Sequence, residues 1–494
     1  MTKVKKTFNI KHPDWRMRRA ERFWYYTSDT ARLLCTALIL NYLTTFLMFQ
    51  GVSTASVAVA IMVVKIIDSV DDVLFGFIVD RIDIKKSKIF GKIAVKGKYM
   101  PWFQLTFWTI PVSTILFFLM PKDSPDALKI GWFFVTYLLF DFSCTLTDVP
   151  MASMVTTLTD NLSERNNILT VKGIITVVAV VVLSIVVSAL ISESMGVSLK
   201  AIGISGALIF LLFMLPMVFK VKEYNTELKN IEQIGSQEKY TFKDMINCVL
   251  TNKYILIYFL AVVVSTVLQT RTALESFIGF YIFGDSMLTT YLMLVAFVPG
   301  FVLGCFLGKF ADKFGKRNLL AFIYAMLAVA SAIIYFFCRD SKMLYILVGG
   351  LCAIPNALVA VAGTFIAPDT IEYTRYKTGK DCAGIFYSLQ SFIGKVFAGL
   401  AGSIALAVLA FFGWKEVQSE SFADLAAQGI TQTENALDAL WNLGYLVPMV
   451  GYTIAAILLY VCYRLKDKDA ALMARCNAGL ITREECEAQL SRKY

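Results

Sequence analysis

The stretch Lys65–Arg81, KIIDSVDDVLFGFIVDR, ends a long apolar run and yet carries three carboxylates within five residues. These are Asp68, Asp71 and Asp72. A carboxylate in the middle of a bilayer costs roughly 2.5–3.5 kcal/mol on insertion scales, so three close together require an explanation. The stretch closes with GFIVDR (Gly76–Arg81), a pattern that returns later in the chain. The three aspartates bear on the function, and the GFIVDR pattern bears on the fold.

The composition identifies a membrane protein. Of the 494 residues, 57% are hydrophobic and 17% are charged, whereas about a quarter of a typical soluble domain is charged. Apolar segments of about 20 residues, each long enough to cross a bilayer as a helix, recur along the whole length. About twelve transmembrane helices are predicted, at 23–50, 52–79, 102–120, 128–157, 168–193, 200–221, 253–282, 287–309, 318–338, 343–368, 383–413 and 440–464.

A short internal repeat predicts two related halves. GFIVDR follows the second predicted helix, and GKFADKFGKR (Gly308–Arg317) follows the eighth. Both match G-x-x-x-D-(R/K), and a polar stretch near the midpoint separates six helices from six. An all-α membrane protein with two six-helix halves around a central site is typical of the major facilitator fold. The predicted parts are an N-terminal arm (1–22), a first half (23–221), a central cytoplasmic loop (222–245), a second half (246–464) and a cytoplasmic tail (465–494).

The net charge of +10 predicts the orientation in the membrane. The arm 1–22 holds eight lysines and arginines against two acids, and the loop 81–98 holds seven against one. The loop 414–439 holds one lysine against five acids. Positive charge on alternate loops places both termini and the 81–101 loop in the cytoplasm of a multi-pass inner (cell) membrane protein. No nucleic-acid partner is needed to explain the charge.

Several classes of chemistry find no support in the sequence. The ten cysteines are scattered without a CxxC pair, and the single histidine, His12, lies in the basic arm. Disulfide frameworks, cysteine metal sites and histidine-based catalysis are therefore not expected. No ATPase signature is present, and no nucleophile–base pair supports a membrane-embedded enzyme. We expect a protein that is not an enzyme and holds no cofactor other than a coupling ion.

Four motifs carry a family resemblance. DSVDDVLFG (Asp68–Gly76) is similar to D-A-x-x-D-P-x-x-G, and GKYMPW (Gly97–Trp102) to G-(K/R)-(F/Y)-x-P-W. DVPMAS (Asp148–Ser153) is similar to D-(I/V)-P-x-x-(S/A), and the segment 369–395 resembles the family's tenth and eleventh helices. On these motifs the chain resembles the glycoside–pentoside–hexuronide:cation symporter family. The resemblance covers most of the chain and implies sugar import with Na⁺ or H⁺ by alternating access; the intact cation motif argues against a sensor.

The three aspartates of the opening stretch predict a cation site. Asp68 lies three residues before Asp71 and four before Asp72, so all three share adjoining parts of one helical face. Hard cations prefer several oxygen ligands, and clustered carboxylates also hold protons more readily. The resemblance implies that these three bind the cation with Thr145 from the fourth helix. The family often has a neutral residue where Asp71 stands, so Na⁺ and H⁺ both remain open.

Two lysines offer another explanation for these carboxylates. Lys65 precedes Asp68 by three residues, and the resemblance places Lys395 beside the same site. Either lysine could form a permanent buried ion pair with a carboxylate, or act as the charge partner during coupling. Farther along, the repeated helix-end motifs predict a gating element made of four residues: Asp80, Arg81, Asp312 and Arg317.

The substrate site is predicted from fewer residues. Asp148 matches the family's sugar-binding aspartate. A second such aspartate, on the first helix, corresponds by counting to Arg32 or a position near it, with Asp29 one turn earlier. An arginine there suits an anionic substrate, because guanidinium binds carboxylates through two hydrogen bonds. Further candidates supply charge or an aromatic face for the sugar ring: Lys172, Arg271, Tyr26 and Tyr373.

The alternatives for this site are simple helix ion pairs. Arg32 could pair with Asp29, and Arg271 with Glu275. The function that the sequence predicts is symport of an anionic glycoside or hexuronide by a monomer. Transport of a neutral glycoside or pentoside, and of a lysolipid, are the alternatives. A lateral apolar opening would favour the lysolipid, and a closed polar cavity would favour a sugar.

Overall fold

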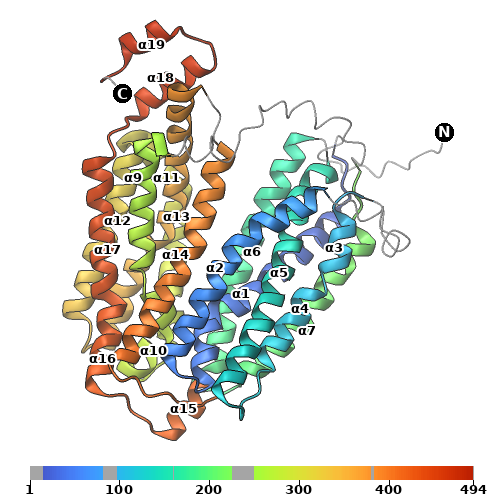
Figure 1. The fold of residues 1–494 in the computed structure, drawn as a ribbon, viewed down its shortest axis with the longest axis vertical. Coiled ribbons are helices and arrows are strands. Elements are labelled where there is room, and N and C mark those ends of the chain that lie inside the picture. The colour runs from blue at the N-terminus through green and yellow to red at the C-terminus, as the bar shows by residue number, and fades with distance from the viewer. Residues whose placement is uncertain (1–14, 82–96, 160, 225–249, 380–382, 493–494) are drawn as a thin grey trace, which may run out of the picture. The chain divides into compact units, whose positions relative to one another are not determined.

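The computed structural model describes residues 15–81, 97–159, 161–224, 250–379 and 383–492; between 69 and 81 it describes the backbone alone. Within these ranges the regular elements are helices, and one isolated bridge joins Gln50 to Gln418. The predicted all-α fold is confirmed (Figure 1).

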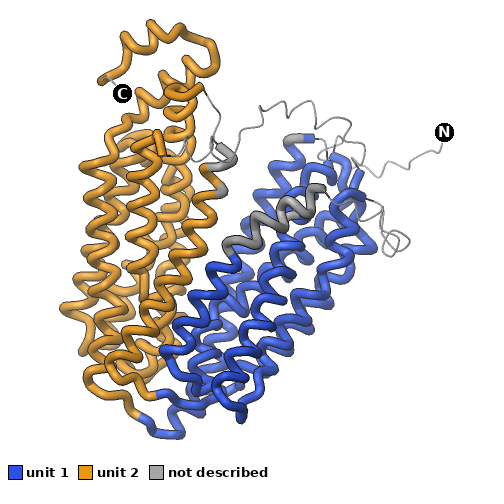
Figure 2. Tube along the Cα trace, in the orientation of Figure 1, with its two compact units in different colours: residues 1–234, 416–430 blue, residues 235–415, 431–494 orange. Residues whose placement is uncertain are grey.

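Two compact units make up the chain (Figure 2). Unit 1 comprises residues 1–234 and 416–430, and unit 2 comprises 235–415 and 431–494. The first division falls inside the predicted loop 222–245, most of which lies outside the described residues. The segment 416–430 belongs to unit 1 although the chain on either side of it belongs to unit 2, which the sequence did not predict.

In the part of the chain that the structure describes, seven helices of unit 1 come from its first segment. They are α1 (Arg19–Phe49), α2 (Thr54–Arg81), α3 (Met100–Thr106), α4 (Thr109–Phe118), α5 (Asp126–Leu158), α6 (Leu162–Ile191) and α7 (Leu199–Lys220), with the short α15 (Phe422–Gln428) from the later segment. Helix α1 packs against α6 and α7, α2 packs against α5, and α4 lies between α5 and α7. Gly203 of α7 makes the last contact close, because a Cβ there would lie 2.1 Å from the Phe118 ring.

Unit 2 contains the remaining helices. They are α9 (Lys253–Val267), α10 (Arg271–Phe283), α11 (Leu288–Phe314), α12 (Lys316–Phe337), α13 (Lys342–Thr378), α14 (Ala383–Phe411), α16 (Glu434–Trp441), α17 (Val447–Ile457), α18 (Asp467–Asn477) and α19 (Arg483–Gln489), with π turns η3 (Asn442–Leu446) and η4 (Leu458–Cys462) beside α17. Helix α13 packs against α11 and α12, and α17 packs against α9 and α12. Helix α18 lies against the end of α13, where the Asn477 amide donates to Glu372 Oε2 at 2.7 Å.

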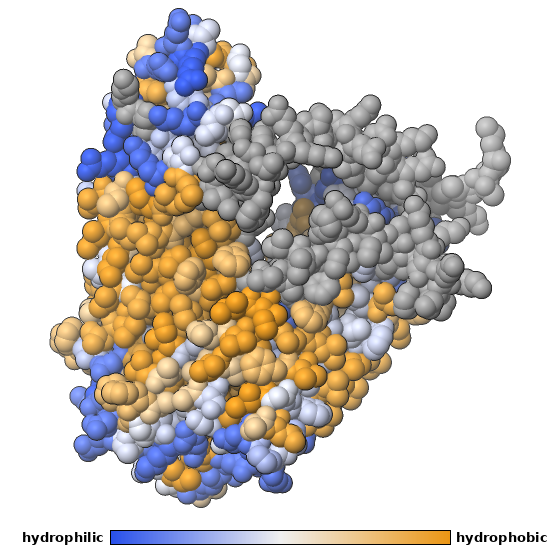
Figure 3. Space-filling model, in the orientation of Figure 1, coloured by the Kyte–Doolittle hydropathy of each residue, from blue (hydrophilic) through white to orange (hydrophobic). Residues whose placement is uncertain are grey.

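Ten helical segments of the described chain are long and apolar enough to cross a membrane. The other two predicted spans coincide with α2 and with the consecutive helices α3 and α4. On the face in view, apolar side chains cover the middle of unit 2 and hydrophilic ones lie toward its two ends (Figure 3). This distribution fits a protein whose middle is solvated by lipid.

The segment 416–430 is tied to unit 1 mainly by backbone groups. The Glu416 carboxylate accepts from the Thr54 amide at the start of α2 (3.2 Å). The Ser419 amide donates to the carbonyl of Phe49 (2.9 Å). The Glu420 carbonyl in turn accepts from the Leu199 amide at the start of α7 (3.0 Å). These bonds satisfy polar groups at helix ends, which would otherwise need water.

Buried glutamates perform the same task at the other ends of the unit 1 helices. Glu164, in the first turn of α6, is fully buried. Its carboxylate accepts from the amides of Arg16 (2.9 Å) and Met17 (3.0 Å), and from Arg22 Nη2 at 3.0 Å. The chain before α1 is thereby held against the start of α6.

Glu223 explains the GKYMPW motif in structural terms. Its carboxylate, after the end of α7, accepts from the amides of Lys98 (3.0 Å), Tyr99 (2.9 Å) and Met100 (2.5 Å) at the start of α3. A carboxylate at a helix N-terminus satisfies unpaired amides and complements the helix dipole. Gly97 has φ +143°, and a Cβ there would lie 2.3 Å from Glu223 Oε1. The glycine is therefore required by the approach of the glutamate.

Replacing Glu223 by alanine is expected to lower the free energy of unfolding by about 1.5–3 kcal/mol, because a buried charge-assisted set of hydrogen bonds is lost. Thermal unfolding of the detergent-purified protein measures the effect. Glu484→Ala, on an exposed turn of α19, is the matched control and should leave the midpoint unchanged. Equal midpoints for the two variants would contradict the role assigned to Glu223.

Candidate functional site

A cluster of four charged side chains joins α1, α5 and α6 inside unit 1. Asp29 and Arg32 come from α1, Asp148 from α5 and Lys172 from α6. Arg32 donates through Nε (3.0 Å) and Nη2 (2.8 Å) to Asp29 Oδ1, while Lys172 Nζ lies 2.6 Å from Asp29 Oδ2. Arg32 Nη1 makes an ion pair with Asp148 Oδ1. The four charges therefore form one chain of contacts with no net charge.

The members of this chain differ in exposure. The Asp29 side chain is 0% exposed and that of Arg32 is 6% exposed, whereas the Asp148 carboxylate is 52% exposed. Burying Asp29 is costly unless it is paired, and two cations pair with it here. Asp148 is the end of the chain that is open to a ligand. Pro150, two residues later, has no amide to donate to the preceding turn of α5, which loosens the helix at this point.

Two tyrosines lie beside the charged cluster. Tyr25 is completely buried, with Lys172 Nζ 6.0 Å from the centre of its ring. Its hydroxyl has no hydrogen-bond partner within the described residues. Tyr26, the predicted aromatic residue, is half-buried and its ring packs edge-on against Tyr25. The sequence did not single out Tyr25, because nothing in the sequence distinguishes it from Tyr26 beside it.

The predicted cation site is described in part. Lys65 Nζ lies 3.0 Å from Asp68 Oδ2 and donates to the Tyr137 hydroxyl at 2.6 Å. The Lys65–Asp68 ion pair considered from the sequence is thus present. The side chains of Asp71, Asp72, Asp80 and Arg81 lie outside the described residues, so their predicted roles stay predictions. The described residues contain no group of three or more histidine, cysteine or carboxylate ligands that could hold a metal.

Helix α5 carries residues of both the predicted cation site and the predicted substrate site. Tyr137, Asp141, Thr145 and Asp148 follow one another at spacings of four, four and three residues, so they share one helical face. The first three are buried. Tyr137 contacts Lys65 at one end of this stripe, and Asp148 contacts Arg32 at the other. Only Thr145 and Asp148 were predicted as site residues, although the spacing in the sequence was sufficient to find Tyr137 and Asp141.

Unit 2 has a charged pair of its own. Arg271 Nη2 makes an ion pair with Glu275 one turn later on α10, as the simple helix alternative proposed. The Arg271 guanidinium also lies 5.5 Å from the centre of the Tyr445 ring. Both charged residues line a cavity of about 50 Å³. Arg271 is therefore placed in a polar interior, and its contact with substrate stays a prediction.

A second polar cavity of about 160 Å³ lies in the same unit. Gln269, Asn356 and Tyr452 line both cavities, and the Gln269 amide donates to Asn356 Oδ1 at 3.4 Å. Gln390 lines the larger cavity and donates to the Tyr258 hydroxyl at 3.3 Å. Amides and hydroxyls of this kind suit sugar hydroxyls. The sequence analysis passed over these amides because single uncharged polar residues in apolar spans are common.

Four further predicted residues belong to unit 2. Tyr373 is buried in the core of unit 2, where its ring packs edge-on against Tyr254 at 5.0 Å. Such packing explains the residue without a sugar. Lys395 is half-buried on α14 in unit 2, and its role as a charge partner stays a prediction. Asp312 is exposed, and Arg317 Nη1 donates to the Tyr463 carbonyl at 3.1 Å.

The fold and the charged helix interiors define a class, the secondary transporters of the major facilitator superfamily. A family model described as MFS/sugar transport protein matches residues 25–467, and the chain belongs to this family. It is a multi-pass membrane protein that transports sugars by symport and is not an enzyme. The resemblance to cation-coupled glycoside, pentoside and hexuronide symporters is thereby confirmed.

Individual relatives agree with this assignment. The chain is 23% identical over 459 residues to the isoprimeverose transporter of Lactiplantibacillus pentosus, covering 92% of this chain and 90% of the relative. It is 24% identical over 425 residues to the glucuronide carrier protein homolog of Escherichia coli K12, covering 85% and 86%. A solved structure of a bacterial homologue of the human lysosomal transporter Spinster has the same fold, with a TM-score of 0.63 and 12% identity over 92% of this chain and 99% of that one.

Removing Asp29 should be far more damaging than removing Asp148. Asp29→Ala leaves buried Arg32 and partly buried Lys172 without the carboxylate that they share, which is expected to cost about 3–5 kcal/mol of stability. Asp148→Ala removes a half-exposed partner and is expected to cost about 1 kcal/mol or less. Thermal unfolding of the purified variants measures both. A loss from Asp148→Ala as large as that from Asp29→Ala would contradict this reading of the cluster.

Proposed function

We propose that this symporter imports an anionic glycoside, such as a hexuronide, together with Na⁺ or H⁺ by alternating access. The observation that carries the proposal is the chain of ion pairs from half-exposed Asp148 through Arg32 to buried Asp29 and Lys172. A carboxylate can accept from sugar hydroxyls, while a guanidinium beside it can bind an acidic group on the same sugar. The two groups are in direct contact, and the exposed one of them is Asp148.

The charge balance favours an anionic substrate with a cation. Arg32 and Lys172 together offset Asp29 and Asp148, so these four side chains carry no net charge. An acidic sugar adds a negative charge that a bilayer interior does not tolerate alone. A coupling cation bound nearby restores neutrality. Charge balance therefore gives a physical reason for sugar and cation to cross together.

Helices α2 and α5 supply the carboxylates for that cation. By sequence, their stretches 60–75 and 132–147 hold one lysine and four aspartates, without Asp148, which pairs with Arg32. Lys65 pairs with Asp68, and the sequence provides no second lysine or arginine within these stretches. An excess of carboxylates attracts a cation or retains protons. Because α5 carries both Asp148 and the stripe toward Lys65, cation and sugar can change each other's affinity reciprocally.

The remaining parts of the proposal concern the protein in the cell. The charge of the loops favours an inner membrane location with both termini in the cytoplasm. We expect the transporter to work as a monomer, because each unit encloses its own polar interior. No cofactor beyond the coupling ion is required for transport by this route.

A neutral glycoside or pentoside is the second candidate substrate. The specific observation in its favour is that Arg32 is already engaged by two carboxylates, Asp29 and Asp148. In that case Arg32 would orient Asp148 for sugar hydroxyls and would not touch the substrate. A lysolipid is less suitable for this cluster, since its acyl chain would lie against charged side chains.

Coupling can be tested in vesicles that contain the purified protein. Accumulation of a labelled glucuronide is expected under an inward Na⁺ or H⁺ gradient and should stop when the gradient is collapsed with an ionophore. Asp68→Asn is expected to abolish this accumulation, whereas Asp123→Asn, in an exposed loop, should preserve it. Accumulation that persists without any gradient would rule out symport.

Arg32 can be tested with a matched pair of ligands. Arg32→Ala is expected to weaken binding of a glucuronide about 10- to 150-fold, the value of a hydrogen bond to a charged group, and binding of the corresponding neutral glucoside about threefold or less. Isothermal titration of the purified protein measures both affinities. Arg32→Lys keeps the positive charge without the planar guanidinium and should retain part of the preference for the glucuronide over the glucoside. An equal loss for the two ligands would mean that Arg32 only orients its neighbours.

A further inference from the structure

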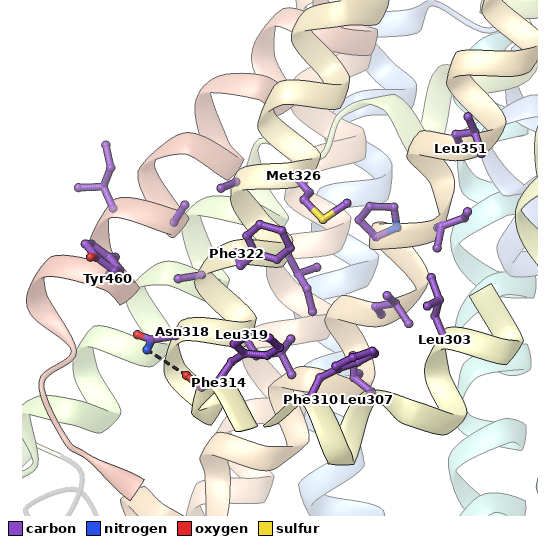
Figure 4. Close-up of a pocket in the computed structure, with 18 of the residues that line it drawn as sticks. Leu303, Leu307, Phe310, Phe314, Asn318, Leu319, Phe322, Met326, Leu351 and Tyr460 are labelled. Carbon is purple, nitrogen blue, oxygen red and sulfur yellow. Dashed lines mark hydrogen bonds between the residues drawn. The ribbon is translucent and has the colours of Figure 1, made fainter. Parts of the chain in front are cut away.

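Unit 2 carries an open groove of about 1040 Å³, and its apolar lining distinguishes it from the polar cavities of the same unit. Helices α11, α12 and α13 form it together with the end of α17 and η4 (Figure 4). Its described lining side chains are apolar except at one end, where Asn318 and Tyr460 carry polar groups. The volume is at the upper end of the roughly 300–1,000 Å³ typical of small-molecule sites.

Basic side chains gather at the end of the groove that carries Asn318 and Tyr460. The Arg317 guanidinium lies 5.8 Å from the centre of the Tyr460 ring, and Lys313 Nζ lies 5.4 Å from that of Phe314. Tyr460 and Phe314 both line the groove. Arg464 is exposed near the same end and donates to the Val461 carbonyl, also a lining residue, at 3.1 Å.

Among the described residues, the hydrogen bonds of Arg317 do not include a carboxylate that would neutralise its charge. Within the described residues its guanidinium donates to neutral oxygens, those of the Tyr463 carbonyl and the Asn318 amide. Two carboxylates lie nearby in the chain. Asp312 is exposed, and Asp467 accepts from the amide of Lys316 at 2.9 Å. The basic groups next to the groove therefore keep a positive field toward a ligand.

The length of the groove matches one leaflet of a bilayer. Along α12 its lining extends from Asn318 to Met326, which is eight helical steps of 1.5 Å, or about 12 Å. Half of a hydrocarbon core is about 15 Å thick. The basic end coincides with the start of α12, which is also the start of a candidate membrane span (Lys316–Phe337), and the groove runs from there along the span.

We propose that this groove binds an anionic phospholipid of the leaflet at the basic end. The acyl chain lies along Phe314, Phe322 and Met326 (Figure 4). The phosphate contacts Lys313, Arg317 and the Asn318 amide. Basic pockets between transmembrane helices are the usual sites for anionic headgroups. In the orientation proposed above, the leaflet is the cytoplasmic one. The lipid is a structural ligand of unit 2 and not the transported substrate.

Two observations separate this site from substrate transport. Within the described residues the groove is lined by no charged side chain, and its polar groups, those of Asn318 and Tyr460, lie at one end, so most of its length is unsuited to a sugar. The charged cluster of Asp29, Arg32, Asp148 and Lys172 belongs to the other unit. A second copy of the chain would be an alternative occupant of an apolar groove, but the basic end would then require an acidic complement on the partner.

Native mass spectrometry of the full-length protein, titrated with phosphatidylglycerol or phosphatidylcholine of the same chain length, tests the proposal. The anionic lipid is expected to bind more tightly. Lys313→Gln with Arg317→Gln should lower its affinity about fivefold for each charge removed and lower that of phosphatidylcholine less, because choline offsets the charge of the phosphate. Arg339→Gln with Lys342→Gln is the matched control, because it removes the same charge beyond the opposite end of α12 and should have no effect.

A second pair of variants tests the acyl chain. Ala325→Trp fills the groove and should weaken both lipids, whereas Ile333→Trp, exposed two turns farther along α12, should not. Equal affinity for the two lipids, equal losses in both double variants, or no effect of Ala325→Trp would overturn the proposal. A dimer that Ala325→Trp dissociates would assign the groove to a second copy. All readouts are binding measurements, so they do not depend on the transport proposal.

Discussion

The buried carboxylate of Asp29 is the group on which the arrangement of unit 1 depends. It lies where neither water nor lipid can solvate a charge, so it must be paired within the protein. Arg32 pairs with it from the same helix and Lys172 from α6, while Arg32 reaches on to Asp148 of α5. One unsolvated charge thus fixes how three helices face one another. The same contacts leave the Asp148 side chain partly exposed, where the substrate is proposed to bind.

Helix α5 gives this cluster a connection to the cation region. Its polar stripe runs from Tyr137, which contacts Lys65, to Asp148, which contacts Arg32. A ligand that changes the charge at either end alters the electrostatic environment of the whole stripe, since the residues between are buried. Coupling in a symporter requires such shared elements. The break in backbone hydrogen bonding at Pro150 lies at the end where the substrate is proposed to bind.

Much of the fold followed from the sequence. Apolar segments of membrane-spanning length gave all twelve predicted helices, each of which coincides with helical structure, because a bilayer forces the backbone of such a segment to form a helix. Within one helix, spacing also predicted which side chains share a face, as for the Lys65–Asp68 and Arg271–Glu275 pairs. Motifs identified the family and pointed to Asp148 and Arg32. These inferences required only local geometry and composition.

The sequence by itself therefore determined the helices, their polar faces and the class of transporter, whereas the tertiary structure decided the partners. The contacts that it decided join segments far apart in the chain: Lys172 pairs with Asp29, Tyr137 contacts Lys65, and Glu223 accepts hydrogen bonds from the Lys98, Tyr99 and Met100 amides. The placement of residues 416–430 with unit 1 also joins distant segments. A buried charge or an unpaired helix end specifies that a partner is needed, but packing between helices selects which of several suitable groups comes within reach.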